Sequence, residues 1–221
     1  MDQTLDNMSF NKIGFQIVKN VISNDLLSHL TNEMNISKSI SDFYTGSPDK
    51  ISSAGDGLVR NAFYHYSSIF GESLMVGLKP EIEKVVGKEL IETYSYHRIY
   101  YKNSELPKHK DRPSCEYSAT ISIQYDHPWE IYVKDLTGKI NKILLEPGDM
   151  CVYKGCEVEH WREPYEGNEM KQIFIHYVDA NGPYKDFKYD TRPIVGLPDS
   201  FKNKVLEESL NLKRKKKIIY I

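Results

Sequence analysis

The sequence predicts a mainly β protein with flanking helices, whose antiparallel strands form either a sandwich or a jelly roll. Two observations lead to this class. After Glu89, short apolar or alternating runs recur between turn residues, and before Glu89 apolar residues recur at helical spacing. The 221 residues contain no repeat or long linker, so we expect one domain spanning residues 1–221. Within it we expect an N-terminal strand and helices at 10–90, a β core at 91–180 and a C-terminal extension at 181–221.

The N-terminal region reads as a strand followed by helices. Residues 13–22 form an apolar run typical of a strand, and residues 23–25 then offer a helix cap before apolar residues at helical spacing up to Met34. Residues 45–58 are rich in Gly, Ser and Asp and predict a loop, whose length suggests that 45–60 covers a substrate. Helical spacing returns at 61–87, where Pro80 is predicted to begin a second helix.

The β core follows as seven short strands. We expect them at 91–101, 115–125, 129–133, 140–145, 150–153, 157–162 and 171–178, with turns such as His-Pro, Thr-Gly and Pro-Gly-Asp between them. The helices would then pack on the outside of the β core. A final amphipathic helix is predicted at 201–212, and the basic run 213–217 reads as a solvated tail rather than a phosphate or lipid contact.

Composition excludes several classes of function. The net charge is −2 with acidic and basic residues interspersed, which argues against nucleic acid or an anionic membrane as a partner. No apolar run approaches the ~20 residues of a membrane span, and the first residues lack the features of a signal peptide. Three cysteines without paired spacing argue against disulfides and structural zinc. We therefore expect a cytoplasmic protein with reduced thiols.

The residues that indicate chemistry are His109, Asp111 and His160. Side chains at positions i and i+2 of a strand share a face, so His109 and Asp111 can bind one ion together. Antiparallel pairing can return His160 beside them, after the Pro147-Gly148-Asp149 turn. Two imidazoles and one carboxylate are the ligand set that holds non-haem Fe(II) on one face and leaves the other face open. A His-x-Asp sequence is frequent by chance, so the surrounding residues decide whether it indicates a metal site.

Those surroundings resemble the 2-oxoglutarate- and Fe(II)-dependent dioxygenases, particularly the prolyl-4-hydroxylase-like and phytanoyl-hydroxylase-like branches, over most of residues 10–180. The pattern of these families falls on Tyr100, Asn103, Leu106, His109, Asp111, Pro147, Gly148, Asp149 and His160. Asn103 stands where the families carry glycine, and asparagine tolerates the same positive backbone angle. The stretches 111–116, 160–164 and 172–178 look like a bacterial and phage subgroup. The resemblance implies a double-stranded β-helix, the cupin-like jelly roll.

The resemblance also implies the co-substrate site. Iron would bind 2-oxoglutarate and O2, with ascorbate as an optional reductant, and a basic residue would anchor the far carboxylate of 2-oxoglutarate. Arg162 lies two positions beyond His160 and shares its face in a continuous strand, whereas Lys171 lies near the spacing that the families use. The resemblance makes Tyr100 a hydrogen-bond partner of the co-substrate, and a strand tyrosine that fills the barrel is the alternative. The sequence does not show which face of the last strand points inward, so Arg162 and Lys171 both stay open.

The reaction that follows from the resemblance couples decarboxylation of 2-oxoglutarate to succinate with oxidation of a C–H bond, by default hydroxylation, in a small-molecule or peptidyl substrate. Two alternatives stay open: a cupin-like metal isomerase or dioxygenase that does not use 2-oxoglutarate, and a non-catalytic binding module on the same fold. The first alternative predicts no basic anchor in the pocket. The substrate and the oligomeric state are left open. The remaining histidines are predicted to be structural or exposed, and among them His176 is a candidate to face the interior beside the site: His29, His65, His97, His127 and His176.

Overall fold

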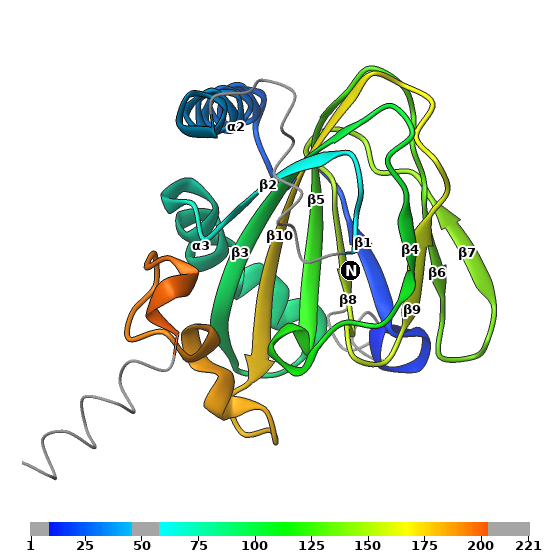
Figure 1. The fold of residues 1–221 in the computed structure, drawn as a ribbon. Coiled ribbons are helices and arrows are strands. Elements are labelled where there is room, and N and C mark those ends of the chain that lie inside the picture. Colours follow the sequence, from blue (N-terminus) through cyan, green and yellow to red (C-terminus); the bar gives the residue numbers. More distant parts are fainter. Residues whose placement is uncertain (1–8, 46–57, 203–221) are drawn as a thin grey trace, which may run out of the picture.

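The computed structural model describes residues 9–45 and 58–202, which form a pair of antiparallel sheets that face each other (Figure 1). The larger sheet has six strands in the order β1-β8-β5-β10-β3-β2, and the smaller has four in the order β4-β9-β6-β7. From β3 to β6, and again from β7 to β10, consecutive strands belong to alternate sheets. This arrangement confirms the predicted mainly β class with flanking helices.

The larger sheet consists of β1 (Phe15–Val18), β2 (Ala62–Tyr66), β3 (Leu90–Tyr101), β5 (Tyr117–Tyr125), β8 (Met150–Tyr153) and β10 (Glu169–Asp179). The smaller sheet consists of β4 (Leu106–His109), β6 (Ile131–Lys134), β7 (Ile140–Ile143) and β9 (Glu159–Arg162). The Pro-Gly-Asp turn before β8 bonds back to the N-terminal segment, where Lys19 Nζ lies 2.6 Å from Asp149 Oδ2. At Gly148 φ is 91°, and a Cβ there would lie 2.9 Å from the carbonyl oxygen of Ile22, so this turn requires glycine.

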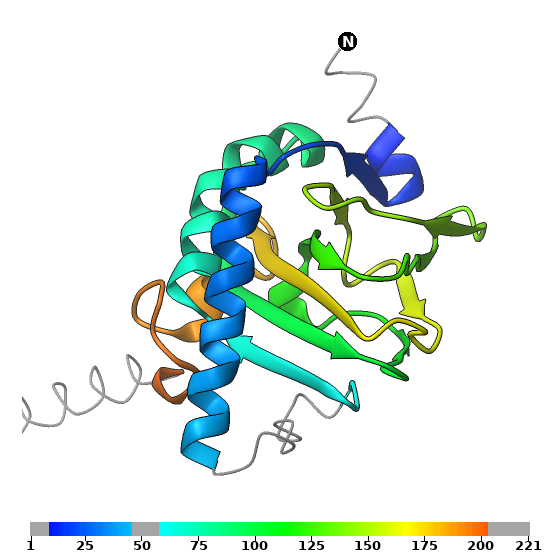
Figure 2. The same ribbon diagram turned by 90° about the horizontal axis from the view of Figure 1, so that it is seen from above.

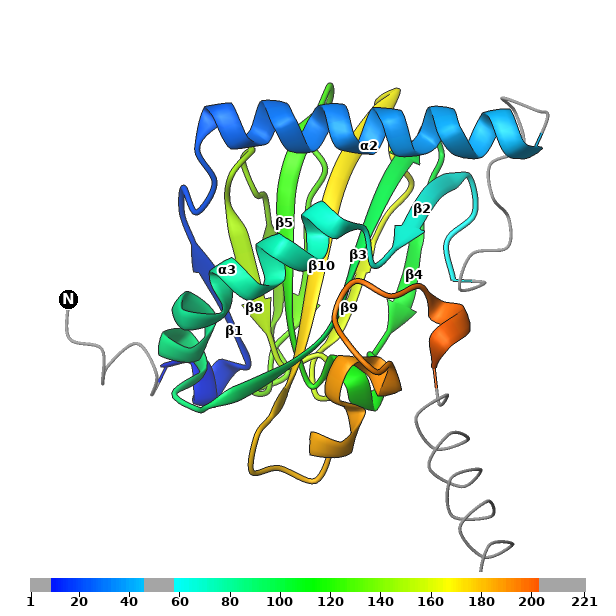
Figure 3. The ribbon, with the colours of Figure 1, turned by 90° about the vertical axis from the view of Figure 1, so that its left-hand side faces the viewer.

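Two long helices, α2 (Asn24–Thr45) and α3 (Ile69–Val86), cover the outer face of the larger sheet (Figures 2 and 3). Ser68 caps α3 by accepting a hydrogen bond from the backbone N–H of Gly71, and Gly87 ends it in the left-handed conformation. The main core lies between helices and sheet and contains Leu30, Met34, Met75, Ile82, Ile99, Ile173 and Ile175 among others. No described helix is both long enough and apolar enough to cross a membrane.

Alternation along β3 and β10 separates the two faces of the larger sheet. Odd-numbered residues such as Ile99 and Ile173 belong to the helix-side core, while even-numbered residues such as Arg98 and Phe174 line the space between the sheets. This parity decides which residues of both strands can reach a site between the sheets.

The structure differs from the sequence predictions mainly at 61–87. Helical spacing predicts a helix from the start of that stretch, but residues 62–66 form β2, which pairs with β3 from Ala62↔Tyr100 to Tyr66↔Tyr96. Pro80 lies inside α3 rather than at the start of a second helix. The first strand is also shorter than 13–22, and β4 is a full strand where the sequence predicts only a strand edge. Most of the predicted loop 45–58, the lid over 45–60, the helix at 201–212 and the basic run lie outside the described residues.

The C-terminal extension contains two 3₁₀ segments, η2 (Lys185–Thr191), which packs against β3, and η3 (Asp199–Phe201). Asp190 fastens it: its carboxylate accepts two bonds from the Arg112 guanidinium, at 2.7 and 2.8 Å, one from Lys202 and one from the Tyr66 hydroxyl. Residues 189–191 all have positive φ, and this strained turn aims the Asp190 carboxylate at its partners. The extension thereby forms one wall of the space between the sheets.

Candidate metal centre and pocket

The three predicted ligands lie together at the mouth of the two sheets. His109 ends β4 and pairs directly with His160 on β9, and their ring centroids are 4.3 Å apart. Asp111 follows β4, and its Oδ1 lies 3.5 Å from His109 Nε2 and 3.6 Å from His160 Nε2. The donor atoms of the three residues all lie within 4.8 Å of one another. One carboxylate oxygen and two imidazole nitrogens therefore converge on one point.

Hydrogen bonds fix which atoms face that point. Nδ1 of His109 lies 2.8 Å from the carbonyl oxygen of Pro107, and Nδ1 of His160 lies 3.2 Å from that of Val158. A carbonyl only accepts, so both rings carry their proton on Nδ1 and present the Nε2 lone pair to Asp111. This is the tautomer that a ligating histidine requires.

The orientation of Asp111 is also fixed by hydrogen bonds, both to the backbone and to neighbouring side chains. Its N–H donates to the carbonyl of Gly155 at 2.9 Å, and its Oδ2 accepts from the hydroxyl of Ser118 at 3.0 Å. Ser118 in turn lies 2.8 Å from Nδ1 of His176 on β10. Oδ2 is thus occupied by Ser118, while Oδ1 faces both imidazoles. His176, predicted to be structural or exposed, lies buried beside the site.

Two of the three groups hold the charge state that binds a cation. Burial raises the pKa of Asp111, but its interactions with His109, His160 and His176 outweigh it and hold that pKa well below its usual range. Burial lowers the pKa of His160, which Asp111 only partly offsets. The carboxylate is therefore ionised and His160 neutral at neutral pH, which are the forms that bind a metal ion.

A cavity of about 670 Å³ opens from this point between the sheets. It is lined largely by aromatic and basic side chains: Tyr64, Tyr66, Tyr94, Tyr96, Tyr153, Phe174, Arg98, Arg112, Arg162 and Lys202. Tyr64 stacks on Tyr96, and Tyr66 on Tyr94, so paired rings from β2 and β3 build one wall. The size suits a small organic molecule together with a short dicarboxylate.

Of the predicted anchors, Arg162 lines this cavity. It lies on β9 two residues after His160, is 2 % exposed, and donates to the carbonyl of Trp129 and, at 3.2 Å, to Oε1 of Gln172. Burial lowers its pKa to about 10, so the guanidinium stays charged at neutral pH. Within 9–45 and 58–202, no carboxylate lies at ion-pair distance from it. A buried cation without a counter-charge is costly unless a ligand supplies that charge.

Lys171 and Tyr100 lie elsewhere. Lys171 has the odd parity of Ile173, so it is on the helix-side face of β10, and its ammonium group bonds to Glu169 and, at 3.2 Å, to Gln124. Tyr100 faces the space between the sheets but is fully buried; its ring packs against Trp129, and its hydroxyl accepts from Arg98 at 3.1 Å. It lies behind the cavity wall, sharing Trp129 with Arg162.

Asn103 confirms the expectation drawn from its place in the pattern, since its φ is 67° where the resembled families carry glycine. Gln172 has no role that the sequence predicts. Its even parity places it beside Arg162, and its amide donates to Thr120 while its carbonyl accepts from the guanidinium.

Comparison with known proteins gives likeness in structure but not in sequence. No family model and no curated protein matches the sequence. Among solved structures, the chain is similar to a Pseudomonas putida prolyl-4-hydroxylase, with a TM-score of 0.58 and 13 % identity over 80 % of this chain and 99 % of that one. It is also similar to the α-ketoglutarate-dependent epimerase SnoN of nogalamycin biosynthesis, with a TM-score of 0.62 and 12 % identity over 89 % of this chain and 91 % of the other.

A third similar structure is Streptomyces hygroscopicus HygX with nickel, 2-oxoglutarate and hygromycin B bound, with a TM-score of 0.59 and 10 % identity over 80 % of this chain and 87 % of that one. At these identities the likeness establishes the fold, which is the double-stranded β-helix. Its bearing on activity depends on the residues of the pocket.

Proposed function

We propose that this protein is a 2-oxoglutarate- and Fe(II)-dependent oxygenase that oxidises a C–H bond of a small organic substrate. The observation that carries the proposal is the meeting, in one cavity, of the His109, Asp111 and His160 donor atoms with the buried Arg162 guanidinium. The first group suits a non-haem iron with open positions, and the second suits a carboxylate. The solved structures of similar fold include a hydroxylase, an epimerase and a nickel- and 2-oxoglutarate-bound protein, which supports the same proposal.

The donor set fits the ion. Neutral imidazoles and a carboxylate on one side are the ligands of non-haem iron oxygenases, and when bound that iron supplies the oxygen activation and the decarboxylation of 2-oxoglutarate to succinate. His109 and His160 would hold it through Nε2, and Asp111 through Oδ1. Ser118 keeps the Asp111 carboxylate from rotating, because it occupies Oδ2.

Arg162 would bind the far carboxylate of 2-oxoglutarate. Gln172 and the Trp129 carbonyl hold the guanidinium in place before any ligand enters, so binding costs little further side-chain entropy. The tyrosine wall and Phe174 would bind the substrate and exclude water from the reacting C–H bond. A metal enzyme that does not use 2-oxoglutarate has no need of a buried cation here, so Arg162 counts against that alternative.

The test is turnover and binding by the purified chain. With Fe(II), ascorbate and 2-oxoglutarate in air, we expect slow succinate formation even without substrate. Anaerobic calorimetry should show 2-oxoglutarate binding only after Mn²⁺ or Fe²⁺ is added. Asp111→Asn should abolish both signals, while Asp25→Asn, on the exposed first turn of α2, should leave them unchanged. Failure of the metal-loaded protein to bind 2-oxoglutarate or form succinate would exclude the proposed activity.

A further inference from the structure

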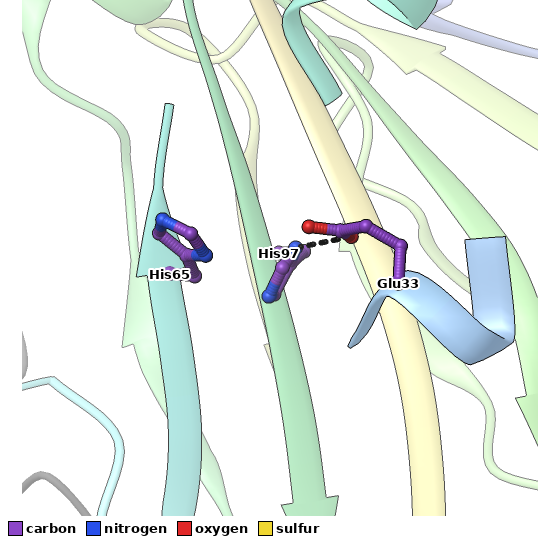
Figure 4. A group of neighbouring side chains, drawn as sticks. All are labelled: Glu33, His65 and His97. Atoms are coloured by element: carbon purple, nitrogen blue, oxygen red, sulfur yellow. Dashed lines mark ion pairs between the residues drawn. The ribbon is translucent and has the colours of Figure 1, made fainter. Parts of the chain in front are cut away.

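A second group of ligand-type side chains lies on the opposite face of the larger sheet. His65 on β2 and His97 on β3 are direct cross-strand partners, and their odd parity points them toward the helices rather than the cavity. Glu33 reaches down from α2 on the far side of His97 from His65, as Figure 4 shows. One donor atom from each of the three residues lies within 4.8 Å of the others. This group, hereafter the helix-side triad, shares no residue with the centre at the mouth of the sheets.

Part of the hydrogen-bonding capacity of the triad, that of His97 and of one Glu33 oxygen, is unsatisfied among the described residues. His97 is 1 % exposed, and neither of its ring nitrogens has a hydrogen-bond partner among the described residues. Its Nδ1 lies 3.4 Å from Oε2 of Glu33, an atom that also lacks a hydrogen bond within 9–45 and 58–202. Buried polar atoms in native proteins are nearly always paired, because leaving one unpaired costs its hydration without a compensating bond.

The remaining hydrogen bonds organise the triad in the way that outer-shell groups organise a metal site. The Ser37 hydroxyl donates to Oε1 of Glu33 at 3.0 Å and lies 3.2 Å from Nδ1 of His65. A hydroxyl has one proton, so while Ser37 donates to Glu33 it accepts from Nδ1–H of His65. That tautomer leaves the Nε2 lone pair of His65 available, with its other nitrogen held by an outer-shell partner.

The charge states agree with this geometry. Burial lowers the pKa of His97 to about 3, with His65 adding to the shift, and burial also lowers the pKa of His65. Both imidazoles are therefore neutral at neutral pH and have lone pairs to donate. Burial raises the pKa of Glu33, and a bound cation would offset that cost of holding a carboxylate charge. Glu33 would then supply one negative charge and partly neutralise a divalent cation.

From this arrangement we propose that Glu33, His65 and His97 form a second metal site, which takes a divalent transition-metal ion of the zinc type. Two histidines and one glutamate are an established zinc donor set, completed by a water molecule as the fourth ligand. Zinc–nitrogen and zinc–oxygen distances of about 2.0–2.2 Å put tetrahedral donors about 3.4 Å apart, so small side-chain rotations bring the triad into range. The ion would tie α2 to β2 and β3 and so acts in stability rather than in the oxygenase reaction.

Counting bound zinc tests the proposal in protein whose first centre has been removed. Metal-stripped Asp111→Ala/His160→Ala protein is incubated with Zn²⁺, freed of excess ion by gel filtration and analysed by elemental mass spectrometry. We expect one zinc per chain, and none after adding His97→Gln. Adding His29→Ala, an exposed histidine on α2, should retain the ion. Wild-type protein should bind two.

His65→Gln provides a second variant in case His97→Gln does not fold, since His65 is only half-buried. Zinc should raise the Tm of the Asp111→Ala/His160→Ala protein, and should leave the Tm of the same protein with His65→Gln unchanged. Absence of zinc from the Asp111→Ala/His160→Ala protein, or equal zinc with and without His65→Gln, would overturn the proposal. Because the first centre is absent throughout, these results do not depend on the proposed oxygenase activity.

Discussion

Arg162 shows how much chemistry a single buried residue can specify. Its guanidinium is held by one backbone carbonyl and one amide, neither of which carries charge. The unfolded chain would hydrate that charge, so the folded state gives up solvation that only an anionic ligand restores. The position is thus explained more readily by binding than by stability.

Replacing Arg162 by Gln should weaken 2-oxoglutarate binding while leaving metal binding intact. Two charge-assisted hydrogen bonds are lost, each worth about 1.5–3 kcal/mol, so we expect the Kd of 2-oxoglutarate to rise roughly 100-fold or more. Anaerobic calorimetry with Mn²⁺ measures both affinities. Lys171→Gln is the matched control, because Lys171 lies on the helix-side face. If Lys171→Gln raises the Kd and Arg162→Gln does not, the assignment of the anchor is reversed.

The residues of the site could be predicted from sequence where spacing alone decides their position. His109 and Asp111 are two positions apart, so their proximity follows from their short separation in the sequence, although β4 ends at His109 and Asp111 lies beyond the strand. Ser118, His176 and Gln172 could not be found in this way, because their roles depend on which face of β5 and β10 points inward. Likewise His65 and His97 are 32 positions apart, and only the β2–β3 register makes them neighbours.

At the scale of elements, the turn between β8 and β9 supports the metal centre. Gly155 accepts the N–H of Asp111, and a Cβ at Gly155 would lie 2.2 Å from the carbonyl oxygen of Cys115 and 2.6 Å from Oδ2 of Asp111. The turn and the segment after β4 therefore approach each other too closely for any larger residue.

Gly155→Ala should consequently destabilise the fold and displace Asp111. Overpacking of this kind costs about 1–3 kcal/mol, and the metal affinity should fall with it. Gly77→Ala is a suitable control: Gly77 is exposed within α3, a Cβ there meets nothing within 4 Å, and the change should stabilise by about 0.5–1 kcal/mol. Urea denaturation and metal titration measure the two effects. Unchanged metal affinity in folded Gly155→Ala protein would contradict the coupling.

Asp190 should give the C-terminal extension a dependence on acid. Burial raises its pKa, but the Arg112 hydrogen bonds and Lys202 outweigh this and hold the pKa below its usual value of 3.8. Its stabilising contribution is therefore complete above about pH 4–5 and is lost as pH falls through the folded-state pKa. Asp190→Asn should cost about 1–3 kcal/mol at pH 7, a difference from wild type that shrinks in acid.

Urea denaturation across pH 3–7 measures that difference. Asparagine matches the shape of aspartate and tolerates the positive φ of 54° at this position, so the comparison removes the charge and one acceptor oxygen without changing the backbone. A gap between the two proteins that stays constant with pH would show that the Asp190 charge does not contribute.

The order of elements could be predicted from sequence better than the type of each element. Turn residues divide the β core into strands close to those observed, yet helical spacing misassigns residues 62–66. Their sequence, Ala-Phe-Tyr-His-Tyr, has aromatic residues that suit either period, and pairing with β3 decides for a strand. Tertiary pairing of this kind leaves no local signal.

At the scale of the whole molecule, two sheets built from distant stretches of the sequence close on one cavity. β3 and β10 supply one wall and β4 and β9 the metal centre, so a bound ligand joins the sheets. Ligand binding should therefore stabilise the whole fold rather than one element.

We expect 2-oxoglutarate to raise the Tm only when a divalent metal ion is present. At a ligand concentration about 100 times the Kd, the stabilisation should be about 2.7 kcal/mol. Thermal melts with Mn²⁺, 2-oxoglutarate or both measure it, and Asp111→Ala should remove the effect of 2-oxoglutarate. An equal shift without metal would mean that the ligand binds independently of the ion.

The alternation of β3 has a consequence for how this chain can change. Alternate residues of β3 serve two different sites. The cavity side has Tyr94, Tyr96 and Arg98, and the helix side has Ser95, His97 and Ile99. A substitution in β3 changes one side chain on one face of the sheet. An insertion or deletion of a single residue would exchange the two, sending imidazole into the cavity and guanidinium toward the helices. The length of β3 therefore decides which side chains line the cavity, just as the identity of each residue does.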